Sequence, residues 1–87
     1  MYDLFFQRAN GKYLLIKENI EEVHDGMDEI SAFLKRHNYT SHYTRYWPID
    51  NGFEFDVGSW SEFFILVKKN TIAAELIVGT EKDFIER

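Results

Sequence analysis

Three aromatic and charged residues at alternate positions are the strongest candidates for a binding role in this 87-residue sequence. Successive side chains of a strand point to opposite faces, so Tyr43, Arg45 and Trp47 would share one face. Tyrosine, arginine and tryptophan dominate the hot spots of protein interfaces. With Asp56 expected beside Trp47 on the next strand, these four residues form the predicted binding surface.

A structural explanation of the same residues stays open. In it, the C-terminal segment covers Trp47, and Arg45 forms an ordinary cross-strand ion pair with Asp56 or Glu54. The need of a small core for large aromatic side chains favours this explanation. Stacking of nucleobases on the aromatic residues of the strand, Tyr43, Tyr46 and Trp47, is a third interpretation. Such stacking normally takes place in a positively charged groove, which this sequence does not obviously supply.

A second candidate surface is acidic. A row of acidic side chains along one side of a predicted helix, the acidic stripe, could imitate phosphates and occupy the basic groove of a nucleic-acid-binding protein. The solvent-exposed face of an amphipathic helix explains the same pattern more simply. At 1.5 Å per residue the stripe would be about 13 Å long, enough to copy only a few phosphates. Its members are Glu21, Glu22, Asp25, Asp28 and Glu29.

Residues capable of metal binding or catalysis are not arranged for either. His24 and His37 would lie on different sides of a helix, and His42 stands at a strand start, so no metal-ligand spacing is present. Ser59 and Ser61 lack the second glycine of a nucleophile elbow and fit turn chemistry better. We therefore expect no metal site, no cofactor and no catalytic residue.

Composition limits the function classes further. The absence of cysteine excludes disulfides and thiolate chemistry. Ten basic against fifteen acidic residues give a net charge of -5, which disfavours direct binding to nucleic acid or to a membrane surface. No apolar run approaches the roughly 18 residues of a membrane span, and no targeting segment is visible. We expect a single cytoplasmic domain spanning residues 1–87.

Two hairpins are predicted. Asn10-Gly11 between apolar segments is typical of a two-residue loop, which would place Phe6 opposite Leu15. Both faces of this hairpin are apolar, so one should meet a helix and the other a second layer, a loop or another subunit.

The second hairpin turns at residues 50–52. A two-residue loop at Asn51-Gly52 would place Pro48 opposite Phe55, with Arg45, Trp47, Glu54 and Asp56 on the outer face. A three-residue loop would bring a charge to the apolar side, so we favour the two-residue loop, although the register stays open.

One helix is predicted from Ile20 to His37, with Asn19 as its N-cap. Its polar side carries the acidic stripe. Because Gly26 inside the helix costs about 1 kcal/mol relative to alanine, a start at a second cap, Asp25, is an alternative. The apolar side is formed by Ile20, Val23, Met27, Ile30, Phe33 and Leu34.

The remaining elements follow the second hairpin. The apolar run 63–67 predicts a strand covered on both faces. Residues 72–78 fit a strand or a short helix, and we favour the strand. Thr80 to Asp83 form a capping box that should open a terminal helical turn, from which Phe84 and Ile85 dock back. Together the elements predict an α+β fold: a mainly antiparallel sheet of five or six strands in ββαβββ order, with one helix on one face.

Three short runs of the central region resemble a pattern in small uncharacterised proteins of Gram-positive bacteria and their prophages. They are Tyr43-Thr44-Arg45-Tyr46-Trp47, Phe55-Asp56-Val57-Gly58-Ser59 and Glu62-Phe63-Phe64. The resemblance implies a compact cytosolic protein encoded on or near mobile elements, and it assigns no catalytic residue.

From this surface and this resemblance we expect a non-catalytic module that binds a host or phage protein, or that self-associates as a homodimer. An acidic mimic that inhibits a nucleic-acid-binding host protein is the alternative. A small enzyme or ligand-binding domain has the least support.

Overall fold

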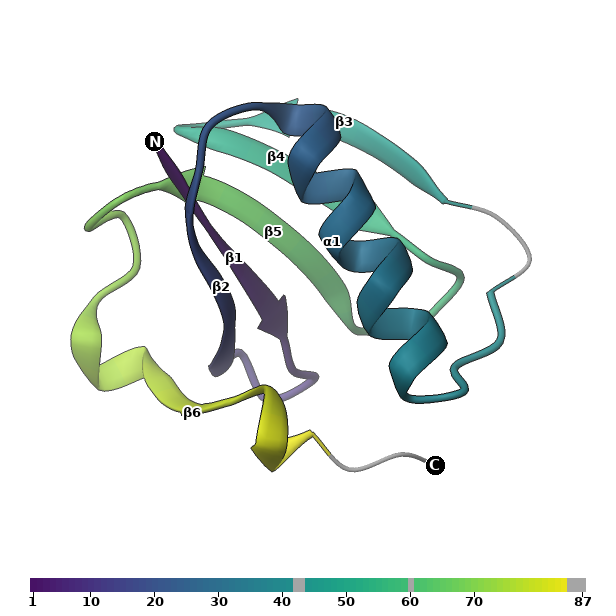
Figure 1. The fold of residues 1–87 in the computed structure, drawn as a ribbon. Coiled ribbons are helices and arrows are strands. Elements are labelled where there is room, and N and C mark those ends of the chain that lie inside the picture. The colour runs from purple at the N-terminus through teal and green to yellow at the C-terminus, as the bar shows by residue number, and fades with distance from the viewer. Residues whose placement is uncertain (42–43, 60, 85–87) are drawn as a thin grey trace.

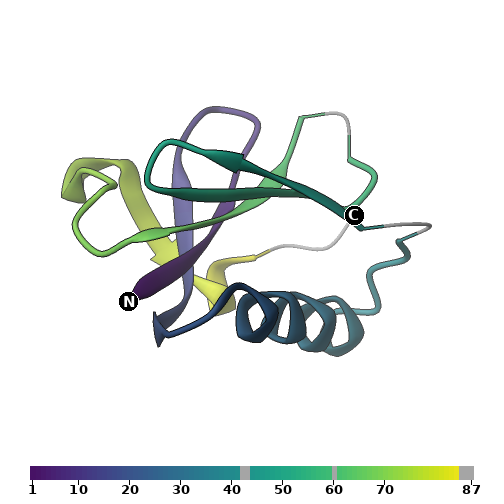
Figure 2. The same ribbon diagram turned by 90° about the horizontal axis from the view of Figure 1, so that it is seen from above.

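The computed structural model describes residues 1–41, 44–59 and 61–84. It has an α+β fold in which one helix covers one face of a six-stranded sheet (Figures 1 and 2). The elements are β1 (Tyr2–Gln7), β2 (Tyr13–Ile20), α1 (Val23–Arg36), β3 (Arg45–Ile49), β4 (Gly52–Asp56), β5 (Phe63–Lys68), η1 (Ala74–Leu76), β6 (Ile77–Thr80) and η2 (Glu81–Asp83).

The sheet is mixed but mainly antiparallel, as predicted. Its strand order is β3-β4-β5-β1-β2-β6, and only the β2–β6 pair is parallel in the described part of the chain. β5 lies near the centre, paired with β4 and β1, and its residues 64–67 are buried. The predicted strand with two covered faces is therefore confirmed.

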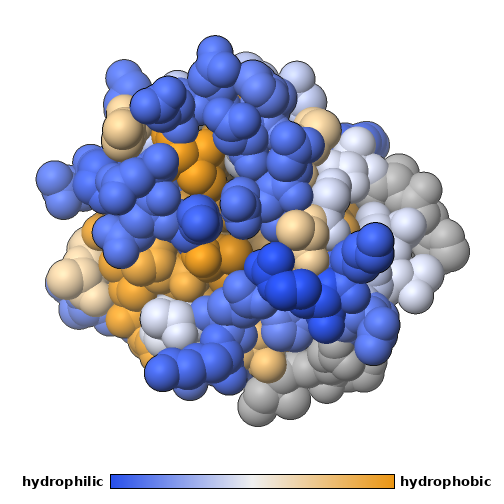
Figure 3. Space-filling model, in the orientation of Figure 1, coloured by the Kyte–Doolittle hydropathy of each residue, from blue (hydrophilic) through white to orange (hydrophobic). Residues whose placement is uncertain are grey.

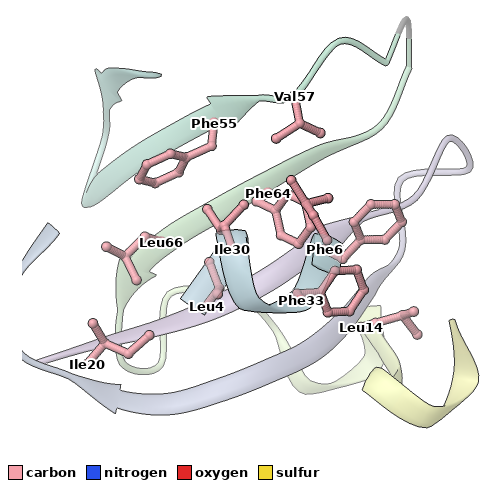
Figure 4. Packing of buried hydrophobic residues seen from close by; sticks show 11 residues of the cluster. Leu4, Phe6, Leu14, Ile20, Ile30, Phe33, Phe55, Val57, Phe64 and Leu66 are labelled. Atoms are coloured by element: carbon pink, nitrogen blue, oxygen red, sulfur yellow. The ribbon is translucent and has the colours of Figure 1, made fainter. Parts of the chain in front are cut away.

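The main core lies between α1 and the sheet (Figure 4). Ile30 and Phe33 of α1 point toward Leu4, Phe6 and other sheet residues, and all four are buried. A Cβ on Gly26 would lie 2.8 Å from Cδ2 of Leu66 on β5. The mid-helix glycine therefore lets α1 approach the sheet closely.

The helix starts later than predicted. α1 begins at Val23 with Glu22 at the N-cap position, because β2 continues to Ile20. Asn19 is therefore not a cap: it has a positive φ of 60°, and its backbone N–H donates to Asp3 Oδ1 at 3.2 Å. The alternative start at Asp25 is also wrong.

The first hairpin has a three-residue loop instead of the predicted two-residue loop. Gly11 N–H donates to the Arg8 carbonyl at 2.9 Å, and Arg8 N–H donates to the Lys12 carbonyl at 2.8 Å. Gly11 takes the left-handed conformation that follows the turn, with φ 82°. Phe6 consequently pairs with Leu14, one residue away from the predicted partner.

The second hairpin has a two-residue loop, but it lies at Asp50-Asn51 and not at Asn51-Gly52. Asn51 takes the positive φ, 64°. Gly52 is the first residue of β4, where an added Cβ would overlap the Leu66 carbonyl oxygen and lie 2.8 Å from the Val67 Cα. The register is shifted by two residues from the prediction, which leaves every side chain on its predicted face.

The sheet face opposite α1, here called the outer face, carries a second apolar cluster. Phe5, Ile65 and Val67 are buried there, with Ile72 and Ile77 packed against them. The expectation that a loop covers the second face is confirmed at this end of the sheet. Residues 72–78 contain both a helical turn, η1, and the start of a strand, β6.

The C-terminal segment docks on the helix side. Thr80 N–H donates to Asp83 Oδ2 at 2.9 Å, which confirms the predicted capping box. The Phe84 ring packs 5.1 Å from Phe6 and 4.9 Å from Phe33 between centroids. Ile85, predicted to dock beside it, lies outside the described residues. In the part of the chain described, no helix is long and apolar enough to span a membrane.

Candidate binding surface on β3 and β4

Arg45 and Asp56 are paired across the outer face of the second hairpin. Arg45 Nη2 donates to Asp56 Oδ2 at 2.7 Å. The Asp56 side chain is 7% exposed, whereas that of Arg45 is 64% exposed. Gly58 N–H also donates to Asp56 Oδ1 at 2.8 Å, so the carboxylate is held from two sides.

Trp47 lies two positions along the same face. It is half-buried, and its indole Nε1–H donates to Glu54 Oε1 at 2.9 Å on the facing strand. Asp56 was expected in this place. The two-residue shift in register puts Asp56 opposite Arg45 and brings Glu54 to Trp47. Without the register, the sequence gives no means of choosing between these two acids.

We call Arg45, Trp47, Glu54 and Asp56 the β3–β4 surface. α1 packs on the opposite face of the sheet, and β6 pairs with β2 at the far edge from β3. Of the C-terminal segment, Ile72 and Ile77 pack on this outer face against Phe5, Ile65 and Val67, in a cluster that does not include Trp47. The cross-strand ion pair of the structural explanation is present between Arg45 and Asp56. Tyr43, the fourth predicted member, lies outside the described residues.

The edge of β3 adds one apolar group to this surface: Ile49 is 37% exposed and lies two positions beyond Trp47 on the same face. Tyr46 is 49% exposed, but alternation along β3 puts its side chain on the opposite face of the sheet, the face that α1 covers. The Tyr46 ring stacks on Phe55 at a centroid distance of 5.3 Å, so its position is fixed by the core. Pro48 lies in the same strand and has no N–H to donate, which disfavours addition of a further strand here. Side chains, and not the backbone, would make the contacts to a partner.

The prediction that the five acidic residues form one stripe on the helix is wrong. Glu21 and Glu22 precede α1, and only Asp25, Asp28 and Glu29 lie within it. The prediction failed because it began the helix three residues too early. Four of the five nevertheless line a shallow groove with Lys17, Asn19 and Ile20: Glu21, Asp25, Asp28 and Glu29.

A possible cation-binding group also lies at the start of α1. Glu22, His24 and Asp25 offer ligand atoms within 4.8 Å of one another. All three side chains are largely exposed, and His24 Nε2 is 3.3 Å from Asp25 Oδ1. Surface ion pairing accounts for this arrangement.

A cluster that the sequence did not reveal joins α1 to the C-terminal segment. Arg36 donates two hydrogen bonds of 2.9 Å to the Glu81 carboxylate, and His37 Nε2 lies 2.8 Å from Glu81 Oε2. The hydrogen bond from Arg36 holds the pKa of Glu81 below its usual value, against the opposing effect of partial burial, and His37 adds to the lowering. The same contact raises the pKa of Arg36. Arg36, His37 and Glu81, which we call the Glu81 clasp, therefore form an ion-paired contact that joins the end of α1 to the C-terminal segment.

The structure thus defines a small α+β protein with a mixed six-stranded sheet, one covering helix and a polar-aromatic surface on β3 and β4. Comparison of the chain with protein-family models, curated proteins and solved structures finds no match.

Proposed function

We propose that this chain is a non-catalytic protein-interaction module, which binds a partner protein or a second copy of itself through the β3–β4 surface. The observation that carries the proposal is the fixation of Trp47 and Arg45 by Glu54 and Asp56 on the face away from α1. A tryptophan and an arginine held in place before binding lose little conformational entropy when a partner arrives. Such residues commonly supply most of the binding free energy of an interface.

The exposed edge of β3 supports the same proposal. Ile49 extends the surface beside Trp47 with an apolar side chain that is 37% exposed, and β3 has only one strand neighbour in the described sheet. Taken with the resemblance to prophage-encoded proteins, this suggests a cytoplasmic accessory factor whose partner is a host or phage protein.

The test is a pull-down with the tagged chain at low and high salt, run beside sedimentation velocity of the purified protein. Trp47→Ala should abolish capture of the partner, or the self-association, while the far-ultraviolet circular dichroism stays unchanged. Val78→Ala is the matched control, because Val78 is 51% exposed on β6 at the opposite edge. Loss of the fold in Trp47→Ala, or equal binding in both variants, would contradict the proposal.

The acidic mimic is the second candidate. The groove lined by Glu21, Asp25, Asp28 and Glu29 supports it, whereas the division of the acids between a turn and a helix weakens the analogy with a regular row of phosphates. Its affinity for a basic protein would fall steeply with salt. Binding that is insensitive to salt would eliminate it. A small enzyme or ligand-binding domain stays the least supported alternative.

A further inference from the structure

The two strands at the parallel edge of the sheet differ in length. β2 has eight residues and β6 has four. The β2–β6 register ends where Leu15 pairs with Thr80. Along residues 16–20 of β2, β1 is therefore the only strand neighbour in the described part of the chain. Asn19 is left-handed, with φ 60°, and its N–H is bonded to Asp3, so the extended part of this edge is residues 16–18.

This open edge lies in a groove. Near the end of β6, the groove is lined by Leu15, Ile16, Lys17 and Glu18 on one side and by residues 80–82 on the other. Figure 3 shows apolar surface over β2 and the segment that leads into β6. Beyond Lys17, a second groove continues along Asn19 and Ile20 to the acidic residues of α1.

The negative charge of the second groove indicates what kind of segment could bind there. Four carboxylates line it against one lysine. Among the described residues, Glu21, Asp28 and Glu29 take part in none of the ion pairs. A strand with lysine or arginine side chains would complement them, whereas a second copy of this chain would bring two sets of carboxylates together.

The edge is also protected against indiscriminate pairing. Lys17 and Glu18 are exposed and charged, and the register of β2 with β1 shifts next to them. Charges and bulges on an edge strand discourage unselective strand addition. Pairing here therefore needs a partner whose own charges compensate.

We infer that an extended, basic segment of a partner protein adds to the open edge of β2 at residues 16–18 and continues along the second groove. Backbone hydrogen bonds to β2 hold the segment, and alternate basic side chains face Glu21, Asp28 and Glu29. At about 3.3 Å per residue, the extended stretch before Asn19 spans about 10 Å, so about three residues of the segment pair with β2 and the rest lie along the second groove. This site lies at the opposite edge of the sheet from β3, so it does not depend on the proposed function of the β3–β4 surface.

The probe is a fluorescent heptapeptide of alternating lysine and valine, with a glutamate-valine peptide as the charge control. Two further lysine-valine peptides carry N-methyl groups on the lysines or on the valines, which blocks one or the other hydrogen-bonding edge. Binding is measured by fluorescence anisotropy, and the site by amide shifts of the nitrogen-15-labelled full chain.

The lysine peptide should bind about tenfold tighter than the glutamate peptide or better, and its largest shifts should fall on residues 16–20. One N-methylated peptide should lose binding and the other keep it. The double variant Asp28→Asn, Glu29→Gln should weaken binding about threefold or more, and Trp47→Ala should leave it unchanged. Equal binding of the two N-methylated peptides, equal binding of the lysine and glutamate peptides, or shifts centred elsewhere would overturn the inference.

Discussion

Two glycine-to-alanine substitutions separate the two reasons for which a fold needs glycine. Gly11 has a φ of 82° with open space around the position of a Cβ. Gly52 has no such φ, but its Cβ would overlap the backbone of β5 at Leu66 and Val67. The same chemical change therefore tests conformational strain at Gly11 and steric overlap at Gly52.

The two costs should differ clearly. Alanine in the left-handed conformation costs about 1 to 2 kcal/mol, so Gly11→Ala should lower the free energy of unfolding by about 1 kcal/mol. At Gly52 the colliding atoms are backbone on both sides and cannot rotate away. β4 must separate from β5 locally, and we expect a loss of about 3 kcal/mol or more. A domain of this size has a free energy of unfolding of about 4 to 13 kcal/mol in total.

The assay is urea unfolding of both variants, followed by far-ultraviolet circular dichroism. With a slope of about 1.5 kcal/mol per molar urea, the midpoint should fall by roughly 0.7 M for Gly11→Ala and by roughly 2 M or more for Gly52→Ala. Equal shifts, or a larger shift for Gly11→Ala, would refute the close approach of β4 and β5 at Gly52.

The clasp and the helix contact give two further predictions. Glu81→Gln should lower the free energy of unfolding at pH 7 by about 1 kcal/mol, because it removes charge-assisted hydrogen bonds from Arg36. Since the folded pKa of Glu81 is lowered, this contribution is complete above the ordinary value of 4.5 and is lost as the pH falls through the folded pKa. Urea midpoints of wild type and variant should therefore differ at pH 7 and converge at acidic pH, once Glu81 is protonated in the folded state, and a constant difference would contradict the ion pair of Arg36 with Glu81. Gly26→Ala should destabilise by up to about 2 kcal/mol, because overpacking against Leu66 outweighs the roughly 1 kcal/mol gained in helix propensity. Thermal unfolding checks this, with Ser31→Ala at an exposed helix position as the control, and a raised melting temperature for Gly26→Ala would show that Leu66 can give way.

Local patterns predicted the elements that depend on local forces. The apolar periodicity of α1 and the capping box at Thr80 are patterns that can be read within a few residues, and the unbroken apolar run of β5 is the pattern of a strand buried on both faces. The predicted registers of the two hairpins were wrong for a different reason. Asn-Gly at residues 10–11 fits both two- and three-residue loops, and Gly52 serves a contact with β5 that lies outside its own turn.

The binding surface shows the same division. Alternation along the strands placed Arg45, Trp47, Glu54 and Asp56 on one face, and the two-residue slip preserved that result. The shift in register changed the acidic residue that accepts the hydrogen bond of Trp47 from Asp56 to Glu54. The clasp at Glu81 joins residues 45 positions apart, and no periodic pattern connects positions at such a distance.

Photo-crosslinking from the β3–β4 surface tests the central claim most directly. Benzoylphenylalanine at Ile49 leaves Trp47 intact and lies at the exposed edge of the same hairpin. In cells that naturally express the chain, irradiation should give a discrete adduct, with a partner protein or a second copy, that disappears when Trp47→Ala is added. The same group at Val78 should give none. Equal labelling at Ile49 and Val78, or an adduct that survives Trp47→Ala, would contradict the role of this surface.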